Sequence, residues 1–128
     1  MNGKILLDTN ILISFFNGNI EYKNRLEKLR IFVPTIVFGK LYFGAEESKN
    51  RLQNLKKIDE FKKYCIVLDV DDYTAKIYGK VKSKLKKRGK PIPENDIWIA
   101  SIAIENNLLL ATQDSHFENV ENIKIENW

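Results

Sequence analysis

The amino-acid sequence predicts an α/β protein: an α/β/α sandwich on a four- to five-stranded, mostly parallel sheet. Short apolar runs at residues 4–7, 31–33, 65–68 and 108–111 have the pattern of buried parallel strands. Segments with helical periodicity separate these runs, and such alternation is typical of a parallel sheet covered on both faces. The length of 128 residues, with no linker-like stretch, predicts one domain over residues 1–128.

Local signals place the boundaries of the remaining elements. Gly18 and Gly89 are expected to close helices, Pro34 to open one, and Asp71 or Asp72 to cap the longest helix. In chain order we expect a strand at 4–7, helices at 9–16 and 20–30, a strand at 31–33, helices at 34–47 and 49–63, a strand at 65–68, helices at 71–89 and 94–106, a strand at 108–111 and a short edge strand at 123–125.

Three aspartates lie where these elements end. Asp8 directly follows the first strand, Asp114 lies just past the fourth strand, and Asp96 lies in the first turn of the preceding helix. Singly, each has a structural explanation as a helix cap, a charge at a helix N-terminus or a turn residue. Jointly, they are expected to meet at one edge of the sheet, since sites in parallel sheets form at the carboxyl ends of strands. Carboxylates fixed in this way hold hard cations such as Mg²⁺ or Mn²⁺.

Four motifs give the chain a resemblance to a known family. They are LLDTNILI at the start, FGKLYFG in the first half, and ENDIWIASIA and ATQDSHF near the end, with Trp128 as a terminal aromatic residue. The chain resembles a PIN-domain ribonuclease, and more narrowly the VapC-like toxin of a VapBC toxin–antitoxin module. The resemblance implies a PIN-like fold, endoribonuclease activity on RNA that depends on Mg²⁺ or Mn²⁺, a cognate antitoxin as partner, and a homodimer.

The resemblance also implies roles for individual residues. The metal-binding carboxylates of the family map onto Asp8, Asp96 and Asp114, and Asn10 and Thr112 would orient these ligands. A further acid of the family, in a Gly-Glu-Leu-x-x-Gly context, maps onto Gly39-Lys40-Leu41-Tyr42-Phe43-Gly44, so that a lysine replaces a glutamate.

Lys40 is expected to weaken the metal site. Its ammonium would occupy the space of a cation and form ion pairs with Asp8 and Asp96, which lowers the affinity for metal. Glu47 lies about 10 Å further along the same helix and does not substitute. Two alternatives stay open: Lys40 extends to solvent and a metal still binds, or the chain is a catalytically inactive PIN-fold module that binds antitoxin or RNA.

The charge distribution suggests where RNA would bind. The net charge of +4 and a pI of about 9.1 favour a polyanionic partner. The longest helix ends in a basic run, which is either a solvated helix face or a phosphate track. The RNA-binding candidates in it are Lys84, Lys86, Lys87, Arg88 and Lys90. The sole histidine, His116, is expected to be a surface residue of its loop.

Two further features bear on location and partners. Cys65 is the only cysteine, which excludes an intramolecular disulfide and fits a cytoplasmic protein. No signal peptide and no apolar stretch of the ~20 residues that a membrane span needs are visible. Aromatic residues are crowded in the first and third helices, and surplus apolar surface there would form a groove for the antitoxin.

Overall fold

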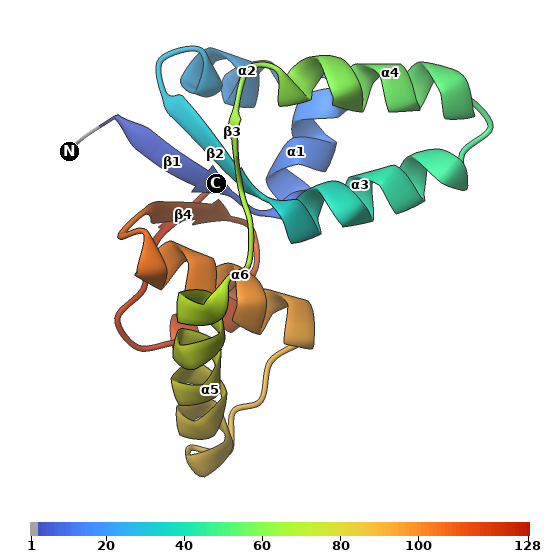
Figure 1. Cartoon of the computed structure of the whole chain (residues 1–128). Coiled ribbons are helices and arrows are strands. Elements are labelled where there is room, and N and C mark those ends of the chain that lie inside the picture. Colours follow the sequence, from blue (N-terminus) through green and yellow to red (C-terminus); the bar gives the residue numbers. More distant parts are fainter. Residues whose placement is uncertain (1–2) are drawn as a thin grey trace.

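The computed structural model describes residues 3–128, which form a five-stranded parallel sheet flanked by helices (Figure 1). The strand order is β3-β2-β1-β4-β5, and every neighbouring pair is parallel. This confirms the predicted sandwich and fixes the number of strands at five. The strands are β1 (Lys4–Leu7), β2 (Arg30–Pro34), β3 (Ile66–Leu68), β4 (Leu109–Thr112) and β5 (Lys124–Asn127).

The direction in which the chain crosses the sheet determines which face each helix covers. From β1 the chain moves outward to β2 and β3, and it then returns to the other side of β1 to form β4. Because such crossovers are right-handed, reversing the direction moves the helices to the opposite face. Figure 1 shows α1 to α4 on one side of the sheet and α5 and α6 on the other. The helices are α1 (Thr9–Phe16), α2 (Ile20–Leu26), α3 (Thr35–Glu46), α4 (Arg51–Lys62), α5 (Asp72–Lys87) and α6 (Glu94–Glu105), with a 3₁₀ turn η1 (Ser115–Asn119).

The central strand β1 is buried from both faces. Ile5, Leu6 and Leu7 are almost fully inaccessible, and Leu6 pairs in register with Leu110 of β4. A fully buried aliphatic side chain contributes roughly 1.5–3 kcal/mol, so this apolar run strongly fixes the position of β1. The first polar side chain after it, Asp8, therefore has to lie at the carboxyl end of the sheet.

Most element boundaries differ from the sequence prediction by one or two residues, and the end of one helix differs by four. The helix expected at 20–30 ends at Leu26, and the N–H groups of Lys28 and Leu29 then form turn bonds to the carbonyls of Arg25 and Leu26. The short edge strand lies slightly later than expected, at Lys124–Asn127, because its ladder is set by pairing with β4. In the part of the chain that the structure describes, no helix has the length and apolar character needed to cross a membrane.

Candidate metal centre

The position of Asp8 is fixed by the junction of β1 and β4. Its backbone N–H donates to the carbonyl of Ala111 at 3.1 Å, which continues the β1–β4 ladder by one residue. One carboxylate oxygen accepts from the N–H of Thr9 at 2.8 Å, as the N-cap of α1, and the other accepts from the hydroxyl of Thr112 at 2.8 Å. Asp8 is 4% exposed, so its charge is held in one orientation at the edge of the core.

Thr112 joins this carboxylate to the next one along the sheet edge. Its hydroxyl donates to Asp8 and accepts from the backbone N–H of Asp114 at 2.9 Å. Thr112 is fully buried at the end of β4, and its carbonyl accepts from the N–H of Trp128 at 3.1 Å. The hydroxyl therefore couples the ends of β1 and β4 where polar groups would otherwise lie unpaired.

Asp96 comes from the helical side of the site. It lies in the first turn of α6, whose N-cap is Pro93, and it is 6% exposed. Burial raises the pKa of its carboxyl, and the charges of Asp8 and Asp114 raise it further, whereas the hydrogen bond with His116 and the charge of Lys40 lower it. The three carboxylates are therefore close enough to repel one another at the carboxyl end of the sheet.

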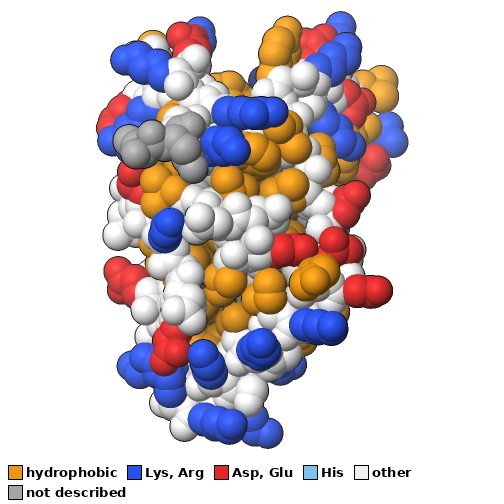
Figure 2. All heavy atoms as spheres, turned by 60° about the vertical axis from the view of Figure 1, so that its left-hand side comes forward, with side chains coloured by type: hydrophobic (Ala, Val, Ile, Leu, Met, Phe, Trp, Pro, Cys, Tyr) orange, Lys and Arg blue, Asp and Glu red, His pale blue; other side chains and the backbone are white. Residues whose placement is uncertain are grey.

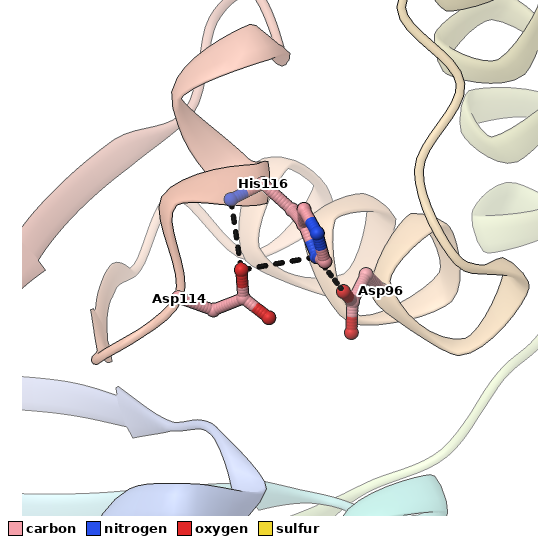
Figure 3. A group of neighbouring side chains, drawn as sticks. All are labelled: Asp96, Asp114 and His116. Atoms are coloured by element: carbon pink, nitrogen blue, oxygen red, sulfur yellow. Dashed lines mark hydrogen bonds and ion pairs between the residues drawn. The ribbon is translucent and has the colours of Figure 1, made fainter.

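Asp114 and His116 complete the cluster (Figure 3). Asp114 is the N-cap of η1 and accepts from the backbone N–H of His116 at 2.9 Å. The Nδ1 atom of His116 lies 3.0 Å from a carboxylate oxygen of Asp114 and 3.2 Å from one of Asp96. One ligand atom from each of these three residues lies within 4.8 Å of the others.

His116 is the site residue that the sequence prediction missed, because it was expected to be an ordinary surface residue. Its side chain is 47% exposed, yet its imidazole contacts the buried Asp96 and the partly exposed Asp114. The signal available in the sequence was its spacing of two residues from Asp114. An N-cap aspartate that accepts the N–H two residues later places that residue's side chain beside its own carboxylate.

Lys40 lies beside the acids without a direct ion pair to them. The ion pairs predicted with Asp8 and Asp96 are absent among the described residues, although the charge of Lys40 still lowers the pKa of Asp96. The reason is its position on α3, where it is half-buried in the lining of a groove of about 320 Å³ between α1, α3 and α4. Glu46, on the same helix, is paired with Arg51 at 2.5 Å and does not take its place.

Other predicted site residues lie outside this cluster. Asn10 is exposed in the first turn of α1, and its side chain makes no hydrogen bond within residues 3–128. In the basic run, Lys84 and Arg88 both pair with Glu121, at 3.3 and 3.7 Å. Lys86, Lys87 and Lys90 are exposed at the end of α5. Figure 1 shows this end of α5 pointing away from the sheet, and Figure 2 shows basic side chains gathered there.

The residues present suit a divalent cation. Carboxylate oxygens are the preferred ligands of Mg²⁺ and Mn²⁺, and Asp96 and Asp114, with His116, bring ligand atoms within 4.8 Å of one another. Asp8 lies outside that group, although its charge acts on Asp96. Burial raises the pKa of Asp96 most, and the charges of Asp8 and Asp114 raise it further; a bound dication would relieve the repulsion between these carboxylates. The Thr112 hydroxyl holds the Asp8 carboxylate and the Asp114 backbone.

Comparison with known proteins finds relatives that match nearly the whole chain. Residues 5–123 match the PIN domain family. The chain is 34% identical to Ribonuclease VapC2 of Rickettsia felis, over 96% of each chain, and 35% identical to Ribonuclease VapC2 of Haemophilus influenzae, over 98% of each. It also superimposes on the crystal structure of VapBC2 from Rickettsia felis bound to a promoter DNA fragment, with a TM-score of 0.91 and 31% identity over 98% of each chain.

These matches run through β1, α6 and β4, the elements that carry the three aspartates. The likeness therefore covers the site as well as the fold, at an identity sufficient to show the family. The chain belongs to the PIN-domain family, among the relatives of the VapC ribonucleases.

Proposed function

We propose that this chain is a metal-dependent endoribonuclease toxin of a type II toxin–antitoxin system, acting in the cytoplasm as one PIN domain over residues 1–128. One observation carries the proposal. Carboxylates from the end of β1, the start of α6 and the end of β4 lie at one edge of the sheet, where burial, and after it the charges of Asp8 and Asp114, raise the pKa of Asp96. Membership of the PIN-domain family and the ribonuclease relatives support RNA as the substrate.

Each aspartate has a role in this proposal. Asp8 and Asp96, the more buried pair, would hold Mg²⁺ or Mn²⁺, and Asp114 would bind the same ion, a coordinated water or a second ion. Thr112 would keep Asp8 and the Asp114 backbone in register by its two hydrogen bonds. When bound, the cation would supply an activated water and charge stabilisation at the phosphate and the leaving oxygen.

Lys40 would attenuate this activity. With a glutamate at that position, four carboxylates would give the pocket a formal charge of −4, whereas three acids and one lysine give −2. A site with less negative charge and one ligand fewer attracts a dication less strongly. Lys40 also favours the second candidate function, a PIN-fold module that binds antitoxin or RNA without cutting.

RNA cleavage separates the two functions. The chain, Lys40→Glu, and Lys40→Glu with Asp96→Asn would be compared on a structured RNA in Mg²⁺ and in a chelator, after removal of contaminating nucleases. The nuclease proposal expects little cleavage by the chain, clear Mg²⁺-dependent cleavage by Lys40→Glu, and none once Asp96 is replaced. If Lys40→Glu is folded and binds Mg²⁺ but leaves RNA intact, the non-catalytic module is the better description.

We also propose that a cognate antitoxin binds in the groove between α1, α3 and α4. The groove combines the apolar side chains of Ile13, Phe16, Leu41 and Ile58 with polar ones, and it is also lined by Lys40, whose charge acts on Asp96. The matching VapBC structures support an antitoxin partner. An antitoxin segment that fills the groove would therefore lie near the catalytic acids and block access to them. A homodimer of the chain is proposed on the resemblance alone.

A pair of isoleucine variants tests the groove. Ile13 is 43% exposed and lines it, whereas Ile20 is 69% exposed on α2 and does not. Ile13→Asp should weaken binding of the co-expressed antitoxin at least about tenfold, since it places a charge in an apolar contact. Ile20→Asp makes the same substitution at an isoleucine outside the groove, and this variant should bind the antitoxin as before. If both variants lose antitoxin affinity equally, or if neither loses any, the antitoxin binds elsewhere.

The basic end of α5 is proposed as a secondary phosphate contact. Lys86, Lys87 and Lys90 are exposed, whereas Lys84 and Arg88 are partly neutralised by Glu121. Each phosphate contact steepens the salt dependence of binding. Reversing the charge of the three unpaired lysines should therefore flatten the dependence of RNA affinity on salt, with no change in metal binding.

A further inference from the structure

The imidazole of His116 is shared between two carboxylates of the metal centre. Nδ1 lies 3.0 Å from an Asp114 oxygen and 3.2 Å from an Asp96 oxygen, and Figure 3 shows the ring directed at both. The backbone N–H of His116 also donates to Asp114. Main chain and side chain thus hold His116 against the same acid, so its place in the site is built by the local turn.

These separations match those between ligands of one cation. Two donor atoms, each about 2.1 Å from an ion and at right angles around it, lie about 3 Å apart. Nδ1 keeps that separation from both oxygens, and all three ligand atoms lie within 4.8 Å of one another. A dication can therefore be bound by small shifts of side chains that are already gathered.

An imidazole changes which dication such a site prefers. Mg²⁺ is bound through oxygen, whereas first-row transition metals also accept imidazole nitrogen. A neutral nitrogen ligand would also replace the ligand that is lost where Lys40 stands, without adding negative charge beside the two acids. Nitrogen and carboxylate together suit Mn²⁺, which accepts both kinds of donor.

We propose that His116 is a metal ligand, through Nδ1, beside Asp96 and Asp114, and that it makes this centre select Mn²⁺ over Mg²⁺. The inference rests on the proposed function, because it deepens the metal dependence of the same site. It assigns a ligand outside the three aspartates and a preference that carboxylates alone would not produce.

Pulsed electron paramagnetic resonance of bound Mn²⁺ tests the ligand directly. Imidazole coordination gives a ¹⁴N coupling, and His116 is the only histidine of the chain, so after removal of any purification tag the signal has one source. The experiment uses the full chain with Mn²⁺ at about pH 8, where an ordinary imidazole is neutral. We expect a ¹⁴N coupling in the wild-type chain and in Lys40→Glu, and none in His116→Gln, which keeps a polar side chain without the imidazole.

Calorimetry supplies the second measurement. His116→Gln should lower Mn²⁺ affinity at least about tenfold and change Mg²⁺ affinity much less. Mutation of residues that merely support metal ligands already lowers metal affinity by about this factor. Mn²⁺ bound without a ¹⁴N coupling, or equal losses for the two ions, would overturn the assignment of His116 and leave the nuclease proposal standing. If neither the chain nor Lys40→Glu binds a dication, the metal-dependent nuclease and the inference fail together.

Discussion

Replacing Lys40 by glutamate should raise the affinity of the metal centre for Mn²⁺ by about tenfold. The substitution changes the local charge by two units. Because the charge of Lys40 acts on the pKa of Asp96, we take its distance from the metal centre as about one Debye length, ~10 Å at 0.1 M salt. At that distance and with the dielectric constant of water, two charges acting on a dication contribute about 1.7 kcal/mol. Without ionic screening this energy corresponds to about a 15-fold change in affinity; salt lowers the effect, and partial burial of the site raises it.

Isothermal calorimetry with Mn²⁺ measures this change, and Lys57 offers a matched control. Lys57 is exposed on α4 and lines the same groove, but its charge is not among those that act on Asp96. Lys57→Glu makes the same charge change at a greater remove from the acids and should have a much smaller effect. Equal affinities for the two variants would show that general electrostatics dominates, and an unchanged affinity in Lys40→Glu would mean that this position does not act on the site.

The buried polar groups of the site lead to three further predictions. Thr112→Val removes the partner of Asp8 and should cost about 1–3 kcal/mol in urea unfolding, since it leaves buried polar groups unpaired. Thr9→Val makes the same chemical change at a buried hydroxyl that has no hydrogen-bond partner among the described residues. It should therefore be neutral or stabilise the protein by up to about 1 kcal/mol. A cost as large as that of Thr112→Val would contradict this. Because the native pKa of Asp96 is raised, the metal-free protein should lose stability as pH rises from about 3.9 through that raised value. Unfolding in a chelator should show that loss, and Asp96→Asn should lack it.

Most elements of the sheet were predictable because β1 to β4 are built on short apolar runs, whereas the edge strand β5 is largely polar. Residues 4–7 and 108–111 can only be buried, so the polar residues after them must emerge at the sheet edge. That reasoning identifies Asp8 and Asp114 from the sequence alone, and the helical position of Asp96 follows from the apolar face of α6. The α/β/α sandwich and the convergence of the acids rest on the same local patterns.

What the sequence did not reveal depends on contacts between distant segments. His116 enters the site because η1 turns it toward Asp96, twenty residues earlier in the chain, and no pattern within its loop encodes that contact. Lys40 was expected to pair directly with the acids, but the groove between α1, α3 and α4 accommodates its side chain. The end of the 20–30 helix was also placed too late, because turn bonds after Leu26 compete with continued helix.

Whether Asp8, Asp96 and Asp114 share one dication can be determined by anomalous diffraction, which locates the ion itself. Crystals of Lys40→Glu grown with Mn²⁺ would be measured near the manganese absorption edge, with crystals of the unaltered chain alongside. We expect one strong peak at the carboxyl ends of β1 and β4, about 2.2 Å from carboxylate oxygens of at least two of these aspartates, and a weaker peak in the unaltered chain. A peak away from all three, or none in Lys40→Glu at saturating Mn²⁺, would contradict the shared metal centre.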